Sequence, residues 1–351
     1  MRDMLPKLSI IIPTCDRASS LREALRSVQC QSARQAIAQV IVSESGTSDK
    51  SREVCAEFTD LPILYEQERA SGPPLRPRWK ATWNLVQSPL VAFLHDEEWW
   101  APDHLEAALD VLELNQDCVA VYANFYKTEG AKYPARSSRK AWRVWVSSGC
   151  DFRRPVLFLD EVSIMLISLL DDTLHYSSLV GRGEVIWEAY QQVITVGDQY
   201  NDARIFPVLL SAKGTIAYVT SPNVFIHAGP YVAATESRTT GWDREIETTK
   251  WLLKREPEKG VLAATKFNQA VSTLSRSGPS HHAFPTFRTV FNGITGRQWD
   301  TLVAECGIDL REPSPAKDTT WFLKLFCPPG LLEIYSRFQS GQPYAVQRKQ
   351  D

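Results

Sequence analysis

The first 125 residues alternate between short apolar runs and longer stretches with helical periodicity. The apolar runs are residues 8–12, 39–42, 63–65, 90–94 and 118–122. Continuous runs of this length are typical of strands buried on both faces. Helices are expected between them, at about residues 20–28, 48–58, 79–86 and 102–112. This alternation predicts an α/β fold with a mostly parallel central sheet flanked by helices.

The first of these helices carries a start signal of its own. Ser20 is followed three residues later by Glu23, the spacing of a capping box. Leu21, Leu25 and Val28 then share one side of the helix. We therefore predict that the helix begins at Ser20.

The pattern changes after residue 126. Residues 127–154 hold eight Lys and Arg against two acids, with Trp142 and Trp145 among them. A mixed strand and helix pattern follows to about residue 235, and helices are expected at residues 243–255, 261–274, 299–306 and 321–338. We predict one domain over residues 1–235, made of two halves (1–125 and 126–235), and a helical C-terminal extension over residues 236–351.

Composition narrows the class of protein. The 351 residues include 39 Lys and Arg against 41 Asp and Glu, a net charge of −2 that argues against a dedicated nucleic-acid binder. The sequence has no apolar run of membrane-spanning length and no secretory pattern. Seven cysteines without a C-x-x-C argue against a disulfide framework or a zinc cage. We expect a cytoplasmic protein.

Polar residues follow three of the predicted strands, where open α/β sheets bind their ligands. The loops are residues 14–19, 43–49 and 95–100. Glu44 could accept hydrogen bonds from a base or ribose, although Asp49 in the same loop also suits a helix N-cap. The acids of residues 96–98 suit Mg²⁺ or Mn²⁺ and a diphosphate, or form a solvated acidic turn.

Two further candidates stand later in the chain. Asp198 follows Gly197 and precedes a helical stretch at residues 203–211, a position where many aspartates only form turns. His227 follows an apolar strand, where a lone histidine is more often structural than a metal ligand. Alone, neither residue indicates a site.

In order along the chain, four segments resemble family 2 glycosyltransferases, which are nucleotide-sugar-dependent enzymes of the GT-A fold, a Rossmann-like arrangement. They are the apolar strand and Pro-Thr-Cys-Asp-Arg of residues 10–17, residues 40–49, residues 93–105, and residues 197–227. The resemblance covers about residues 6–230, and it implies a nucleotide-binding half at residues 1–125 and an acceptor half at residues 126–235.

This resemblance implies a role for each matching residue. Pro13, Thr14, Asp16, Arg17, Glu44, Lys80 and Asp96 would bind the nucleotide sugar, most simply a UDP-sugar; Glu97, Glu98 and His227 would hold Mn²⁺ or Mg²⁺; and Asp198 would be the general base. The acceptor hydroxyl would attack opposite the nucleotide, so that the anomeric configuration inverts. The metal would stabilise the departing diphosphate.

The sequence departs from the family pattern at several of these positions. Glu44 replaces the usual aspartate, His95 stands first in the acidic metal motif, Glu97 stands third, and glycine precedes Asp198. An acid nevertheless survives at each key position, which argues against inactivation.

Alternatives to this reading stay open. One is a catalytically degenerate nucleotide-binding or scaffold module. A sugar nucleotidyltransferase is disfavoured because residues 13–20 contain no glycine, and an oxidoreductase because no G-x-G-x-x-G follows the first strand.

The acceptor is not specified by the sequence. The basic segment at residues 127–154 suits an acceptor glycan, a lipid-linked sugar or another anionic acceptor, nucleic acid included, or is a solvated loop. Residues 175–178 and Arg182 are further acceptor-side candidates. The helical extension could pack on the catalytic domain, form a homodimer or dock peripherally on a membrane.

Overall fold

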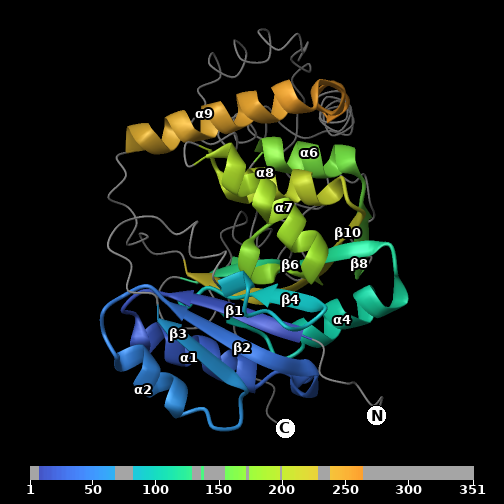
Figure 1. Ribbon diagram of the computed structural model, residues 1–351. Coiled ribbons are helices and arrows are strands. Elements are labelled where there is room, and N and C mark those ends of the chain that lie inside the picture. Colours follow the sequence, from blue (N-terminus) through green and yellow to red (C-terminus); the bar gives the residue numbers. More distant parts are fainter. Residues whose placement is uncertain are drawn as a thin grey trace, which may run out of the picture. The chain divides into compact units, whose positions relative to one another are not determined.

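The structure is a computed structural model in which helices flank one ten-stranded mixed sheet (Figure 1). It describes residues 8–67, 82–128, 136–137, 155–170, 174–197, 200–227 and 238–263. The chain divides into two compact units, Met1–Ala263 and Ala264–Asp351, and the described residues all belong to the first.

The elements follow one another in the order that the periodicity predicts in the first third of the chain. The strands are β1 (Leu8–Thr14), β2 (Ile37–Glu44), β3 (Ile63–Gln67), β4 (Leu90–Phe93), β5 (Trp99–Trp100), β6 (Cys118–Thr128), β7 (Arg136–Ser137), β8 (Val156–Leu159), β9 (Val180–Arg182) and β10 (Thr215–His227). The helices are α1 (Ala18–Gln29), α2 (Lys50–Ala56), α4 (His104–Leu114), α6 (Glu161–Leu170), α7 (Gly183–Val196), α8 (Asp202–Ser211) and α9 (Arg238–Arg255), with 3-10 turns η1 (Arg34–Ala36) and η2 (Tyr176–Ser178).

The predicted mostly parallel sheet is confirmed, with β9 reversed inside it and the strands β5, β7 and β8 also antiparallel to their neighbours. The strand order is β3-β2-β1-β4-β9-β6-β10-β5, with β7 beside β6 and β8 beside β10. Strands β3, β2, β1 and β4 pair in parallel, as do β6 and β10. Strand β9 lies antiparallel to both β4 and β6 and joins these two groups. The parallel strands therefore deliver their carboxyl ends to one edge of the sheet.

Close packing at β9 depends on a glycine. A Cβ built on Gly181 would lie 2.6 Å from the Val119 carbonyl oxygen, a backbone atom that cannot turn aside. Gly181 pairs with Val91 of β4 and Ala120 of β6. A side chain at this position would push apart the two groups of strands.

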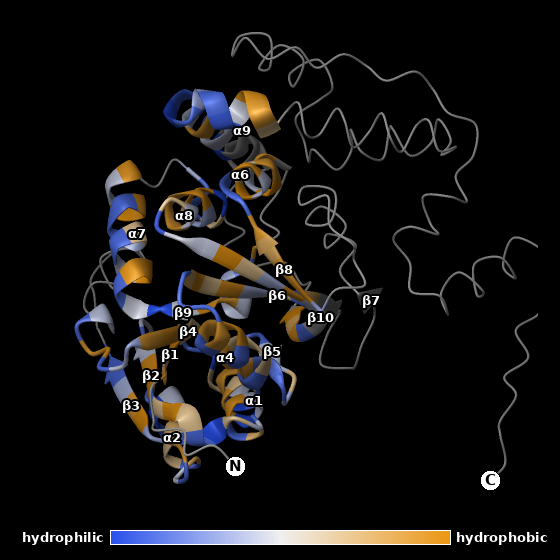
Figure 2. Cartoon of the chain, turned by 90° about the vertical axis from the view of Figure 1, so that its right-hand side faces the viewer, coloured by the Kyte–Doolittle hydropathy of each residue, from blue (hydrophilic) through white to orange (hydrophobic). Residues whose placement is uncertain are grey.

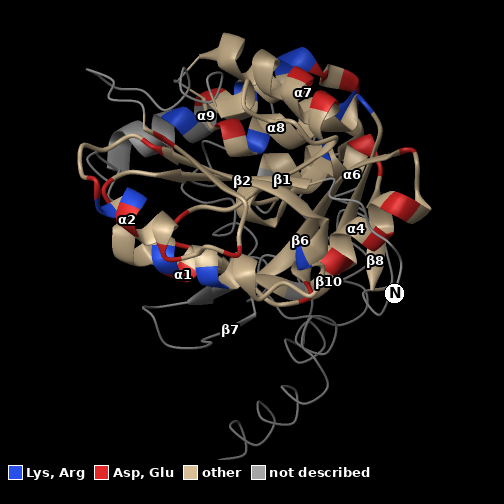
Figure 3. Ribbon diagram, turned by 60° about the horizontal axis from the view of Figure 1, so that its bottom comes forward, with Lys and Arg blue, Asp and Glu red and all other residues tan. Residues whose placement is uncertain are grey.

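The core lies between the sheet and its helices. In β1, Leu8 and Ile10–Ile12 are fully buried, as expected for a strand covered on both faces. Figure 2 shows hydrophobic residues along the central strands and on α4 and α6. Figure 3 shows charged residues mainly on the helices, among them α1, α4 and α7. No helix in the described part of the chain is both long enough and apolar enough to cross a membrane.

Two local predictions are wrong. Helix α1 begins at Ala18, and its N-cap, Arg17, makes no side-chain capping hydrogen bond. The Leu21 amide already donates to the Arg17 carbonyl at 3.0 Å, so Ser20 lies inside the first turn and cannot cap it. The helix expected to reach residue 86 ends earlier: residues 82–83 are helical and a turn follows.

Helix α9 is held against α8 by paired hydrogen bonds. The Asn201 amide donates to Thr248 Oγ1 at 2.7 Å, and Arg204 donates to Thr249 Oγ1 at 2.8 Å. The predicted boundary at residue 235 lies outside the described residues, as do the helices predicted at residues 299–306 and 321–338 and most of the one at 261–274.

Candidate active site

The loop after β2 is built around the buried carboxylate of Glu44. One oxygen, Oε1, accepts hydrogen bonds from the backbone amides of Asp16 at 3.1 Å and Gly46 at 2.5 Å. Asp16 has a positive φ of 53°, and its Oδ1 accepts from the Ser48 amide at 2.8 Å. Glu44 thus ties the loop after β1 to the loop after β2. Its second oxygen, Oε2, is buried without a hydrogen-bond partner among the described residues.

Gly46 is required where these two loops meet. A Cβ at this position would lie 2.2 Å from Oδ1 of Asp16. The absence of a side chain lets the Asp16 carboxylate pack against the loop backbone and reach Ser48. The glycine of the 43–49 loop therefore has a steric basis.

The turn after β4 places Asp96 and Glu97 against the end of β1. Thr14 Oγ1 donates to Asp96 Oδ2 at 2.6 Å, and Arg17 Nε lies 3.1 Å from the same oxygen. A terminal nitrogen of Arg17 lies 2.6 Å from Glu97 Oε2. One guanidinium therefore bridges both carboxylates, the geometry that its planar fork favours.

Asp96 is the more buried of these two acids. Its side chain is fully buried, whereas Glu97 is 18% exposed. Burial raises the pKa of Asp96 to about 6, against the opposing effects of Thr14 and Arg17. Its second oxygen, Oδ1, is buried and has no hydrogen-bond partner within the described ranges. The pair can thus accept a further donor or cation at the sheet edge.

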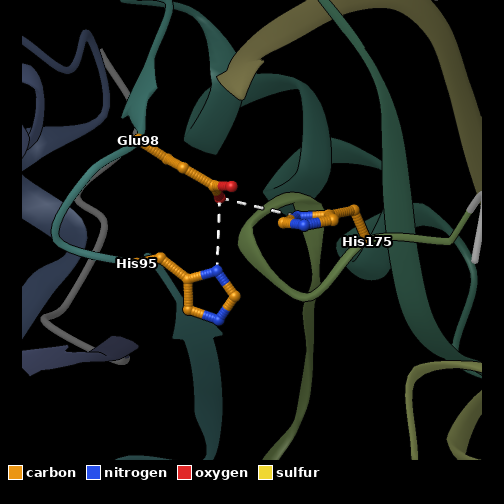
Figure 4. Close-up of side chains that lie close together, drawn as sticks. All are labelled: His95, Glu98 and His175. Carbon is orange, nitrogen blue, oxygen red and sulfur yellow. Dashed lines mark ion pairs between the residues drawn. The ribbon is translucent and has the colours of Figure 1, made fainter. Parts of the chain in front are cut away.

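The other two residues of the same turn face a different neighbour (Figure 4). The Glu98 amide donates to the His95 carbonyl at 3.1 Å, which closes the turn and brings the two side chains together. Oε2 of Glu98 lies 3.5 Å from Nδ1 of His95 and 3.5 Å from Nδ1 of His175. Together these three side chains form a cluster that we call the imidazole site.

Ser177 of η2 joins the two loops that carry the imidazole site. Its hydroxyl accepts from the His95 amide at 2.9 Å, and its carbonyl accepts from the indole nitrogen of Trp100 at 2.6 Å. The Ser177 amide in turn donates to Nδ1 of His175 at 3.3 Å. Ser177 is itself fully buried, so these contacts fix the histidines relative to the 95–98 turn.

Opposite charges at the imidazole site shift the pKa values of both Glu98 and His95. Burial favours the neutral form of Glu98, but the positive charge that His175 and His95 carry when protonated holds its pKa below its usual range. Burial likewise favours neutral His95, but Glu98 and the neighbouring acids raise its pKa overall. An ionised Glu98 therefore needs positive charge or a proton donor from its histidine neighbours.

The structure describes most of the candidate residues but not all of them. Thr14, Arg17, Asp96 and Glu97 come together, Pro13 precedes them in β1, and Asp16 lies with Glu44 on the neighbouring loop. Lys80 and Asp198 lie outside the described residues. His227 is the last residue of β10, opposite Thr128 of β6, and its side chain is not described.

His175 joins the site without a local sequence signal. The stretch at 175–178 suggests only an unspecific acceptor-side candidate, and nothing near it marks a partner for Glu98. The antiparallel strand β9 follows directly after η2 and lies beside β4, which brings residue 175 to the 95–98 turn. The proximity of His175 to Glu98 therefore follows only from the strand order of the sheet.

Comparisons with known proteins agree on the class of domain. The model for glycosyl transferase family 2 matches residues 9–165. Glycosyltransferase GlyA of Streptococcus pneumoniae is 29% identical over 132 residues, which are 36% of this chain and 18% of that protein. Validoxylamine A glucosyltransferase of Streptomyces hygroscopicus subsp. jinggangensis is 29% identical over 106 residues, 30% of this chain and 25% of that protein. The matches thus span a quarter or less of these relatives' lengths.

Solved structures show the same fold at low identity. The crystal structure of S. aureus TarS 1-349 has a TM-score of 0.54 at 11% identity, covering 97% of this chain and 93% of that one. The same TarS fragment in complex with UDP-GlcNAc has a TM-score of 0.52 at 13% identity, with the same coverage. The predicted GT-A fold is therefore confirmed.

Proposed function

Because the model for glycosyl transferase family 2 matches residues 9–165, we propose that this chain transfers a sugar from a UDP-sugar to an acceptor hydroxyl. One observation carries the proposal. Thr14 ends β1, Arg17 follows it, and Asp96 and Glu97 follow the neighbouring parallel strand β4, so that the four side chains converge at the carboxyl end of the sheet. UDP is the favoured nucleotide because a TarS structure of the same fold holds UDP-GlcNAc.

The nucleotide occupies the side of the site formed by β1 and β2 in this proposal. Pro13 and Thr14 line the base pocket, with Asp16 and Lys80 on the donor side. Oε2 of Glu44 accepts a hydrogen bond from the base. That oxygen suits the role because Oε1 already holds the loop amides, while Oε2 is buried without a partner in the described structure. Asp96 receives the ribose through its unpartnered Oδ1.

The diphosphate belongs beside Glu97, and the residues there fit a hard divalent cation. Carboxylate oxygens are the ligands that Mg²⁺ and Mn²⁺ prefer, and Glu97 is partly exposed. Glu97 and His227 would hold such an ion, which would neutralise charge developing on the leaving diphosphate. Glu98 suits this ion less well, because its carboxylate lies between His95 and His175. Arg17 adds a fixed positive charge beside the same phosphates.

Asp198 is the proposed general base. It follows Gly197, which ends α7 with a φ of 101°, and it precedes α8. Its carboxylate would take the proton of the acceptor hydroxyl as that oxygen attacks the anomeric carbon opposite the diphosphate, with inversion. The acceptor would approach from the side of the basic 127–154 segment, most of which is outside the described residues.

A panel of nucleotide sugars with Mn²⁺ or Mg²⁺ tests the proposal. We expect one UDP-sugar to raise the melting temperature and to be hydrolysed slowly without an acceptor. Asp198→Asn should lower turnover by on the order of 10²–10⁴ while donor binding persists. Asp110→Asn, an exposed change on α4, is the matched control and should keep full activity. The proposal fails if no donor binds or if Asp198→Asn turns over at the wild-type rate.

A second candidate is a nucleotide-binding module without turnover. Its support is the pairing of Arg17 with both Asp96 and Glu97, which supplies those carboxylates with a cation from the protein itself. It predicts that a UDP-sugar raises the melting temperature equally with and without Mn²⁺ and is never hydrolysed. Donor turnover in the panel above would exclude it.

A further inference from the structure

We propose that His95, Glu98 and His175 form a binding site for a transition-metal ion of the Zn²⁺ type, separate from the ion that would hold the diphosphate. Two imidazoles with one carboxylate favour zinc and similar metals over Mg²⁺, which prefers oxygen ligands alone. The adjoining pair, Asp96 and Glu97, offers only oxygen. One four-residue turn thus presents two chemically different sets of ligands.

The spacing of the three side chains fits such an ion. Oε2 of Glu98 lies 3.5 Å from each of the two Nδ1 atoms, and all three ligand atoms lie within 4.8 Å of one another. Ligand atoms around a tetrahedral zinc with bonds of about 2.0–2.1 Å are about 3.4 Å apart. Two of the three separations already match, and the third pair lies within 4.8 Å (Figure 4).

The buried carboxylate is the second observation that points to an ion. The Glu98 side chain is fully buried, and neither of its oxygens has a hydrogen-bond partner among the residues that the structure describes. An ionised carboxylate without hydrogen bonds is costly to bury. The two imidazoles approach it only at the limit of hydrogen-bond distance. A cation between the three groups would satisfy Glu98 directly.

The His175 contact with Ser177 agrees with a neutral ligand. Nδ1 of His175 accepts from the Ser177 amide at 3.3 Å, so in this structure it carries a lone pair and no proton there. A nitrogen in that state cannot donate to Glu98, which leaves the carboxylate and the lone pair facing each other. The bond to Ser177 is long, and the ion would compete for the same lone pair.

The surroundings hold the ligands in place and leave an entry path. Ser177 binds the His95 amide and Trp100, so both loops of the site are fixed before an ion arrives. His95 is 27% exposed and His175 13%, so the ion can enter from the histidine side while Glu98 forms the floor. A water molecule would complete the tetrahedron, as in three-ligand zinc sites.

Co²⁺ titration of the chelator-stripped full chain tests this proposal without any sugar substrate. Tetrahedral Co²⁺ absorbs visible light, and Zn²⁺ should displace it with loss of the band. We expect one ion per chain and a melting temperature that rises with Zn²⁺. Glu98→Gln and His175→Asn should each abolish the band and weaken zinc binding by about 100-fold or more, since even outer-shell changes cost 10–100-fold.

Three control variants make the result specific. Glu97→Gln changes the neighbouring acid of the same turn and should keep the band. Cys15→Ser and Cys30→Ser remove exposed thiols that could bind metal elsewhere and should also keep it. If Glu98→Gln does not fold, as judged by circular dichroism, the partly exposed His95→Asn replaces it, with loss of the band expected.

Two results would overturn the proposal. One is a wild-type chain that binds neither Co²⁺ nor Zn²⁺ at micromolar concentration. The other is a visible band that survives both His175→Asn and the folded Glu98 or His95 variant. Neither result bears on donor binding or turnover, so the proposed sugar transfer is tested separately.

Discussion

Two pairs of residues in the turn after β4 have opposite surroundings. Asp96 and Glu97 face β1 and share the guanidinium of Arg17, with a hydroxyl from Thr14. His95 and Glu98 face η2, where Glu98 meets a second imidazole. The first pair presents oxygen ligands already bound to a protein cation, and the second presents nitrogen and oxygen ligands around an unsatisfied carboxylate.

This difference arises from the backbone of a short turn. The hydrogen bond from the Glu98 amide to the His95 carbonyl closes the turn, so the first and fourth side chains lie on one side. The second and third then point to the other side, towards the loop after β1. Consecutive acids therefore need not form one metal site, because a turn can divide them between two.

The largest expected effect comes from breaking the oxygen pair. Glu97→Gln removes the carboxylate proposed to hold the diphosphate's cation, and each 1.36 kcal/mol of lost transition-state stabilisation lowers the rate about tenfold. We expect UDP-sugar turnover to fall by about 10²–10³-fold, since a metal supplies several kcal/mol. Steady-state kinetics with the donor identified in the panel measures this change.

The control for Glu97→Gln lies on helix α7. Glu184→Gln makes the same chemical change at an exposed position in the first turn of α7 and should leave turnover unchanged. The melting temperature of Glu97→Gln should stay near that of the wild type, because Glu97 is partly exposed and pairs with Arg17, which is more exposed still. Wild-type turnover in Glu97→Gln would assign the diphosphate to other residues.

The oxygen pair could be predicted from the sequence, whereas the imidazole site could not. Asp96 and Glu97 directly follow an apolar strand, and the carboxyl ends of parallel strands meet at one edge of the sheet. The position of Glu44 at the end of β2 can be predicted for the same reason. The locations of Asp96, Glu97 and Glu44 depend on the apolar strands next to them in the chain, and the periodicity of the sequence predicts both those strands and the fold.

His175 depends instead on a long-range pairing. It reaches Glu98 because β9 runs antiparallel between β4 and β6, and three residues give too little periodicity to predict such a strand. The family resemblance places Arg17 among the expected donor-binding residues, but its bridge between Asp96 and Glu97 follows only from the side-chain positions. The predicted capping box at Ser20 is wrong because helix α1 already starts at Ala18, so that Ser20 lies inside the helix.

A third histidine shows what the imidazole site gains from Glu98. His104 at the start of α4 is fully buried beside Trp100, and neither ring nitrogen has a hydrogen-bond partner in the described part of the chain. Burial lowers the pKa of His104 from 6.5 to about 3, whereas Glu98 and the acids near it raise the pKa of His95. The two imidazoles differ mainly in whether a carboxylate faces them.

The shift at His104 predicts a loss of stability in mild acid. Below about pH 6.5 the unfolded chain binds a proton at His104 that the folded chain does not bind until about pH 3, so stability falls as the pH falls through this window. At pH 5 this amounts to about 2 kcal/mol. His104→Phe should remove that part of the fall, measured as the change in urea-unfolding free energy between pH 7 and pH 5. An unchanged pH dependence in His104→Phe would mean that another group causes the acid sensitivity.

The smallest expected effect concerns the cation that distinguishes the oxygen pair. Arg17→Gln leaves Asp96 and Glu97 without their shared guanidinium, which should destabilise the metal-free chain by about 1 kcal/mol, since Arg17 is one-third exposed and solvent screens the pair. This corresponds to a fall of about 2–4 °C in melting temperature.

Mn²⁺ should recover more stability in Arg17→Gln than in the wild type, because the ion no longer competes with the guanidinium. Zn²⁺ at the imidazole site should stabilise both chains equally. If Mn²⁺, like Zn²⁺, stabilises Arg17→Gln only as much as it stabilises the wild type, then Arg17 does not compete with Mn²⁺ for Asp96 and Glu97. The proposed electrostatic difference between the two ligand sets of the turn would then be wrong.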